Sequence, residues 1–275
     1  MRKDKWNQLK KQLFGAVEGE VWIDAVCVSH LGKVRERNED NLYYKGCILP
    51  RMHDREKKLK EWRYKTRCLQ AVAVFDGMGG ENAGDLASFT SAREFQKCCK
   101  KLVKKQEMPD EEQITQMLTD VSNTVFQTAK EEHYGLIGST ATVFFMKGNK
   151  GILADLGDSP MYQVRNGEMN LISQAHTDAE LLKQQGIDRK PALTQFLGIN
   201  AKEFLIEPYI REVNLKSGDQ YLLCSDGLTD MMTDEEIEQI LIQKCTISEK
   251  LNLLLCTVLE RGAKDNTTII LCEVM

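Results

Sequence analysis

The segment STATVFFM (139–146) opens a run of short apolar segments that decides the fold. It continues with GILADLG (151–157) and PMYQVR (160–165), and turns at Asn166–Gly167 into EMNLIS (168–173). An Asn-Gly pair flanked by alternating apolar residues is the strongest short-range signal for a two-residue hairpin. The run therefore predicts a meander of antiparallel strands.

Strand-like and helical patterns alternate in blocks before the meander. Two short Val-rich runs, 21–29 and 70–77, are typical of strands. Around 83–102 and 114–129, apolar residues recur at three- and four-residue steps, which is typical of amphipathic helices. Pro109–Asp110 separates these two helices and supplies a break and an N-cap.

Similar blocks follow the meander. The sequence predicts strands at 209–215 and 220–225, helices at 234–243 and 248–260, and a closing strand at 266–274. Strands separated by paired helices favour layers of an α+β fold over βαβ units.

The composition is that of an ordinary globular protein, with 42% hydrophobic and 28% charged residues. Forty-one acidic against 37 basic residues leave a net charge of −4, so we expect no nucleic-acid partner. The apolar runs fall far short of the roughly 20 residues that cross a bilayer, so we expect no membrane span. The basic N-terminus lacks the continuous apolar core of a signal peptide and predicts a weak surface helix.

Nine cysteines at irregular spacings, without a C-x-x-C motif, do not form a disulfide framework. Reduced thiols predict a cytoplasmic protein. The segment 51–67 carries eleven charged residues of both signs and little apolar content. It predicts a solvated insertion loop or a short helix, with docking of a substrate as the alternative.

Acidic residues recur where predicted strands end or begin. They are Asp76 in DGMGG, Asp226 in SDGLTD, Asp158 in LGDS, Asp265 in KDN and the pair Glu39–Asp40 in RNED. Each alone could be a turn residue or a helix cap, but gathered carboxylates repel and need a cation. Oxygen ligands without Cys or His favour Mg²⁺ or Mn²⁺. Two such ions can clamp a phosphate and ionise a water for in-line attack.

Six motifs in order resemble the type-2C, PPM-type metal-dependent protein serine/threonine phosphatases in their bacterial form. The motifs are Arg35-x-x-x-Glu39-Asp40, Asp76-Gly77-Met78-Gly79-Gly80, Gly138-Ser139-Thr140-Ala141, Gly157-Asp158-Ser159, Ser225-Asp226-Gly227-Leu228-Thr229-Asp230 and Asp265-Asn266-x-Thr268. The resemblance implies a phosphatase domain over 21–275 behind an extension at 1–20. It also implies a central sandwich of two antiparallel sheets flanked by pairs of helices.

The resemblance further implies two core Mn²⁺ or Mg²⁺ ions. Asp76 would bridge them and the carbonyl of Gly77 would complete one shell. Asp226 and Asp265 would bind the other side of the pair. Asp158, together with Asp226, would hold a third and weaker ion.

Residues that precede Asp76 in the sequence, together with Met78, complete the implied site. Glu39 and Asp40 would hold metal-bound waters, with direct binding as the alternative for Asp40. Arg35 would bind the substrate phosphate, because a guanidinium suits a phosphate geometrically; Arg37 would lie on the surface. Met78 stands where eukaryotic relatives have a histidine proposed as general acid, so water would have to protonate the leaving oxygen.

Three other functions compete with this interpretation. A cysteine-based phosphatase needs C-x₅-R, and none of the cysteines has Arg six positions on. A catalytically dead relative would have lost a bridging aspartate, whereas all candidates are present. A phosphatase of small phosphomonoesters stays open. The expected partners are phosphorylated proteins, substrates of a serine/threonine kinase.

Overall fold

The computed structural model describes residues 19–54, 59–79 and 83–275. The surface helix predicted near the N-terminus falls within residues 1–18, outside the described part. No helix among the described residues is both long enough and apolar enough to cross a membrane.

One antiparallel sheet runs in the order β10-β9-β12-β13-β1-β4. Its strands are β1 (Trp22–His30), β4 (Lys60–Lys65), β9 (Met161–Arg165), β10 (Glu168–Leu171), β12 (Gln220–Cys224) and β13 (Thr267–Val274). The N-terminal β1 pairs with the C-terminal β13 along its length, from Ile23 opposite Val274 to His30 opposite Thr267. This pairing brings the first and the last described strands side by side within one sheet.

The second sheet runs in the order β11-β8-β7-β5-β2-β3, and a further short strand, β6, pairs with the end of β5. Its strands are β2 (Asp40–Tyr44), β3 (Cys47–Ile48), β5 (Gln70–Gly79), β6 (Ile137–Ser139), β7 (Ala141–Lys147), β8 (Lys150–Leu156) and β11 (Tyr209–Asn214). The strands β7 and β8 are buried almost throughout, because this sheet is covered on both faces.

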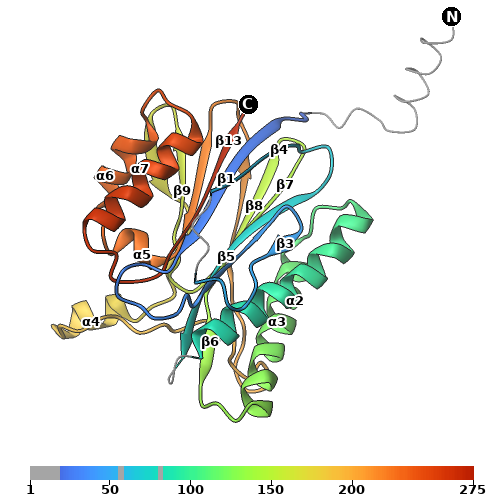
Figure 1. Cartoon of the computed structure of the whole chain (residues 1–275). Helices are drawn as coiled ribbons and strands as arrows, with labels where there is room; N and C mark the ends of the chain where they lie inside the picture. Colours follow the sequence, from blue (N-terminus) through green and yellow to red (C-terminus); the bar gives the residue numbers. More distant parts are fainter. Residues whose placement is uncertain (1–18, 55–58, 80–82) are drawn as a thin grey trace, which may run out of the picture.

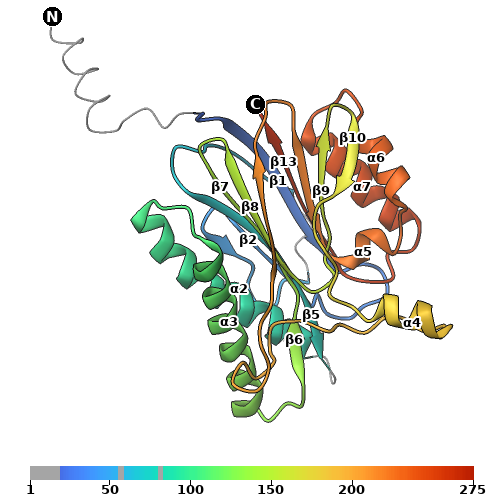
Figure 2. The same cartoon turned by 180° about the vertical axis from the view of Figure 1, so that it is seen from behind.

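Helices cover the outer face of each sheet, as Figures 1 and 2 show. The pair α2 (Gly84–Lys105) and α3 (Glu111–Glu131) packs on the β5 sheet. The pair α6 (Asp234–Leu241) and α7 (Ile247–Glu260) packs on the β13 sheet. Between the sheets, apolar side chains of both inner faces form the central core. The predicted α+β sandwich with flanking helix pairs is confirmed.

Two local predictions are also confirmed. Asp110 caps α3, and its side chain accepts a hydrogen bond from the backbone N–H of Gln113 in a capping box. Asn166 and Gly167 have φ angles of 56° and 83°, the left-handed values that a two-residue hairpin of this type requires. They join β9 to β10.

The prediction of a loop or helix over 51–67 is wrong for its second half. Residues Lys60–Lys65 form the edge strand β4, paired with β1. Trp62 and Tyr64 pack against the central core. The charged residues that alternate with them, Glu61, Arg63 and Lys65, are exposed. The high charge of this segment hid the alternation of partly buried and exposed residues that is typical of a strand. Charged residues suit an edge strand because they discourage pairing with another chain.

Several short elements had no prediction. They are β2, β3, β6, α4 (Ala179–Gln185) and α5 (Asp226–Thr229). Each is too short to show a periodic pattern, yet β2, β6 and α5 carry or adjoin the acidic residues. None of the nine cysteines, all of them within the described residues, forms a disulfide.

Candidate metal and phosphate site

Two carboxylates face each other where β2 and β5 pair. Asp40 and Asp76 are direct partners in the antiparallel register, so their strands bring them together from 36 residues apart in sequence. Asp40 is only 1% exposed. Burial raises the pKa of Asp76 well above its usual value, and the negative charges of Asp40, Asp226 and Asp158 raise it further. Two acidic groups held this way favour either a proton or a cation between them.

Hydrogen bonds from the other sheet fix the orientation of Asp40. The Ser225 hydroxyl donates to Asp40 Oδ2 at 2.8 Å, and the Thr268 backbone N–H donates to Ser225 Oγ at 3.0 Å. Burial raises the pKa of Asp40 to about 7, although the hydrogen bonds from Ser225 and Thr268 act in the opposite direction. The charges of Asp226 and Asp265 raise it further. Asp40 is thus anchored in place but electrostatically strained when ionised.

Asn266 ties the loop before β2 to the start of β13. Its Nδ2 donates to the carbonyl oxygens of Leu31 and Arg37 at 2.7 and 3.0 Å, and its Oδ1 accepts from Glu39 N at 2.7 Å. These three bonds fix the backbone that carries Arg35 and Glu39. The sequence motif contained Asn266, but nothing in it showed this positioning role.

Gly77 lies where no side chain fits. A Cβ there would stand 2.2 Å from the Gly84 carbonyl oxygen and 2.4 Å from that of Glu39. The Glu39 carboxylate in turn accepts from the backbone N–H of Gly84, at the start of α2, at 3.0 Å. Burial raises the pKa of Glu39, and this N–H lowers it. The glycines therefore let β5, α2 and the Glu39 loop meet at one point.

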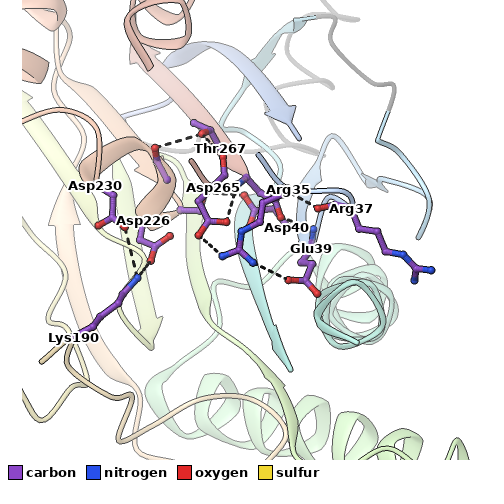
Figure 3. Close-up of polar contacts among 12 residues, drawn as sticks. Arg35, Arg37, Glu39, Asp40, Lys190, Asp226, Asp230, Asp265 and Thr267 are labelled. Atoms are coloured by element: carbon purple, nitrogen blue, oxygen red, sulfur yellow. Dashed lines mark hydrogen bonds and ion pairs between the residues drawn. The ribbon is translucent and has the colours of Figure 1, made fainter. Parts of the chain in front are cut away.

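Arg35 lies among the carboxylates, whereas Arg37 points away from them (Figure 3). Arg35 Nη2 is 2.6 Å from Asp265 Oδ2, and its Nη1 is 3.7 Å from Glu39 Oε2. The Arg37 guanidinium lies 3.7 Å from Asp85 on α2 instead. The structure therefore brings together the arginine selected from the sequence spacing with two of the predicted acidic residues.

A lysine that the sequence did not single out also lies beside the carboxylates. Lys190 Nζ lies 3.0 Å from Asp226 Oδ2 and 3.6 Å from Asp230 Oδ2 (Figure 3). The charge of Asp226 is the main cause that raises the pKa of Lys190. Lys190 belongs to the irregular segment between α4 and β11, where no motif marks it. Only the folded chain places it beside the acidic residues.

Asp158 joins the same cleft from the turn after β8. It lines a cavity of about 410 Å³ together with Asp76, Asp226 and Lys190. Burial raises the pKa of Asp158, the charge of Asp226 raises it further, and Lys190 lowers it. Thr140 supports the floor of the cleft, as its hydroxyl accepts from the Asp76 backbone N–H at 3.0 Å and contacts Ser159 Oγ at 2.7 Å.

The donor set and its charge fit divalent cations. Among the described residues, no three acidic, histidine or cysteine side chains surround a common point closely enough to hold a metal as they stand. Instead, the ammonium of Lys190 forms an ion pair with Asp226 and the guanidinium of Arg35 forms one with Asp265. These two side chains partly neutralise the carboxylates in place of metal ions. A metal would require these two side chains to move aside, and hard carboxylate oxygens would then be free to bind it.

Sequence comparison identifies the relatives of this chain. Residues 57–260 match the family described as Protein phosphatase 2C. The serine/threonine phosphatase Stp of Listeria innocua is 30% identical over 255 residues, which cover 88% of this chain and 92% of Stp. The phosphatase PstP of Mycobacterium tuberculosis is 28% identical over 90% of this chain and 44% of PstP.

Structure comparison agrees. The solved catalytic domain of PstP, in complex with two manganese ions, superposes with a TM-score of 0.70 at 25% identity, over 93% of this chain and 99% of that domain. PppA of Pseudomonas aeruginosa superposes with a TM-score of 0.69, also at 25% identity, over 93% of this chain and all of PppA. The fold, the sequence match over most of the chain and the similarity to Stp lead to one conclusion: the chain belongs to the protein phosphatase 2C family.

Proposed function

We propose that this chain hydrolyses phosphoserine and phosphothreonine esters in proteins, using water activated at a centre of two Mn²⁺ or Mg²⁺ ions. The observation that carries the proposal is the pair Asp40 and Asp76, opposite each other on β2 and β5, with Asp40 buried and Asp76 half-buried. The charges of Asp226, Asp158 and Asp265 act on Asp76 as well. So many carboxylates in one place cost stability unless cations neutralise them.

The resemblance to the family suggests a role for each acidic residue. Asp76, the register partner of Asp40, would bind both ions. Asp226 and Asp265 would bind from the β12–β13 side. On the other side, the contributors are the Gly77 carbonyl oxygen, Glu39 and Asp40.

When bound, the core ions would neutralise the carboxylates and acidify the attacking water, and a third ion at Asp158 would acidify the water that protonates the leaving oxygen. Met78 carries no titratable group, so it has no proton to give. The serine or threonine oxygen is a poor leaving group without a proton. Asp158 and Asp226, which line the same cleft, are the residues that would hold water on the leaving side.

Arg35 would bind the phosphoryl oxygens of the substrate. Its guanidinium is held by Asp265 and Glu39 at the edge of the acidic cluster, and its side chain is 46% exposed. Cations that neutralise these carboxylates would release the guanidinium toward an anion. A planar guanidinium can donate two parallel hydrogen bonds to a phosphate, which fixes its orientation for in-line attack.

The relatives support the proposal. Stp and PstP are named serine/threonine phosphatases, and the solved PstP domain holds two manganese ions. We further propose that residues 21–275 form the phosphatase domain and residues 1–20 an extension of it. The free thiols support a reducing cytoplasm as its compartment, with phosphoproteins made by a serine/threonine kinase as its substrates.

The test is phosphate release from phosphothreonine and phosphoserine peptides by chelator-treated protein, with and without added Mn²⁺ or Mg²⁺. We expect turnover with either ion and none without. Turnover in the presence of excess chelator would contradict the metal mechanism. Turnover of small phosphomonoesters but of no phosphopeptide would show that the substrates are small molecules instead.

A further inference from the structure

The cleft beside Asp76 and Asp158 has a second, chemically different side. The cavity of about 410 Å³ is lined by Met78, Leu136 and Phe196 in addition to its acidic residues. Within this one cavity, carboxylates form the part where the proposed ions and the phosphoryl group would bind. Pro191, Ala192 and Leu193 line the cavity as well, so its lining has six apolar residues. We call Met78, Leu136 and Phe196 the apolar wall.

Two residues of the apolar wall, Met78 and Phe196, lie over a glycine. Met78 on β5 is the register partner of Gly138 on β6. A Cβ on Gly138 would lie 2.8 Å from Met78 Cε and 2.5 Å from Phe196 Cδ2, so both side chains lie directly over that residue. A larger residue at this position would collide with Met78 and Phe196, so glycine leaves the space that these two side chains occupy.

Leu136 extends the wall into solvent. It comes directly before β6, and its neighbour Ile137 is 1% exposed in the core while Leu136 is 64% exposed. Strand geometry sends successive side chains to opposite sides, so burying Ile137 turns Leu136 outward. A single exposed leucine is ordinary, but one that lines a hollow together with two other apolar residues marks a binding surface.

The size of the cavity limits what can reach the apolar wall. An extended peptide advances about 3.3 Å per residue, so a cleft of this volume holds the phosphorylated residue and its immediate neighbours. An apolar side chain next to the phosphorylated residue would cover Leu136 and displace water from it.

We propose that the apolar wall selects substrates with a bulky apolar residue, such as leucine, methionine or phenylalanine, within two positions of the phosphorylated serine or threonine. The inference rests on the proposed phosphatase activity and names the class of phosphoprotein that it serves. An apolar pocket discriminates one or two methylenes by about tenfold or somewhat more in kcat/KM.

The test compares phosphothreonine peptides that share an alanine background. Each peptide carries one leucine at a position from two before to two after the phosphothreonine, and kcat/KM is measured with Mn²⁺. We expect at least one leucine peptide to exceed the all-alanine peptide by about tenfold. Hydrolysis of every peptide at equal kcat/KM would refute the proposed selection by the apolar wall, but it would still support the phosphatase activity. Hydrolysis of none would refute the activity itself.

Substitutions then locate the preference. Leu136→Ser should bring the ratio of kcat/KM for the preferred leucine peptide over the alanine peptide close to one. Leu136→Lys should shift the preference toward glutamate at the same position. The matched control is Leu253→Ser on α7, a leucine that is 41% exposed on the opposite helical layer, and it should keep the wild-type ratio. An unchanged ratio in both Leu136 variants would overturn the assignment.

Discussion

The burial of Asp40 predicts that the metal-free protein loses stability as the pH rises. Its pKa is raised to about 7 in the folded protein from an ordinary value of 3.8. Folded Asp40 therefore keeps a proton that the unfolded chain has already released, and stability falls with pH between these two values. Its register partner Asp76 has a raised pKa too and adds to the same trend.

The size of the effect follows from the linkage relation. Each pH unit below the folded pKa costs about 1.4 kcal/mol, so unfolding becomes easier by about 2 kcal/mol between about pH 5.5 and pH 8. For a chain of this length we expect the melting temperature to fall by about 4–8 °C over that range. Asp40→Asn removes one of these ionisable groups, so its metal-free melting temperature should vary less with pH than that of the wild type.

The assay is thermal unfolding in excess chelator at several pH values, followed by circular dichroism, for the wild type and Asp40→Asn. Added Mn²⁺ should raise the melting temperature of the wild type most at high pH, because the ion binds the ionised carboxylates. Ser225→Ala is an informative control, since it removes the hydrogen bond to Asp40 but keeps the carboxylate. A pH dependence that is the same in the wild type and Asp40→Asn would refute the reasoning.

Three further substitutions, together with Arg37→Ala as a control, separate the roles in the site. Arg35→Ala should reduce kcat/KM for phosphopeptides by about 10–150-fold through the loss of a charge-assisted contact, without weakening Mn²⁺ binding in calorimetry, while Arg37→Ala should have little effect. Asp158→Ala should reduce kcat more for phosphopeptides than for p-nitrophenyl phosphate, because phenolate leaves without a proton. Lys190→Met should tighten Mn²⁺ binding by up to about fivefold in calorimetry, since it removes an exposed cation that competes for Asp226.

Each of these has an outcome that counts against it. A larger defect at Arg37 than at Arg35 would mean that the other arginine binds the phosphate. Equal losses on both substrates would exclude proton supply at Asp158. Weaker Mn²⁺ binding in Lys190→Met would show that Lys190 supports the site instead of competing for it.

The layers and the acidic residues could be predicted because their signals are local. In β5 an apolar run leads into Asp76, and β12 is a short apolar run followed closely by Asp226. The helices α2 and α3 are long enough to show a helical period. The turn at Asn166–Gly167 requires left-handed backbone angles, and Asn and Gly are the residues that adopt them most readily. Such patterns do not depend on distant parts of the chain.

The contacts that depend on distant residues could not be predicted. Lys190 contacts Asp226, 36 residues away in sequence, and Asn266 contacts Glu39, 227 residues away. No local sequence pattern indicates either contact. The strand β4 was missed for a different reason. Its charged residues concealed the alternation of Trp62 and Tyr64, which matters only once β1 lies beside it.

The most direct test of the metal centre is anomalous diffraction from crystals soaked in Mn²⁺. We predict two strong peaks about 3.5–4 Å apart with the Asp76 carboxylate between them, and the loss of both peaks and of Mn²⁺-dependent activity in Asp76→Asn. The absence of peaks at this carboxylate in the wild type, or full activity in Asp76→Asn, would contradict the account.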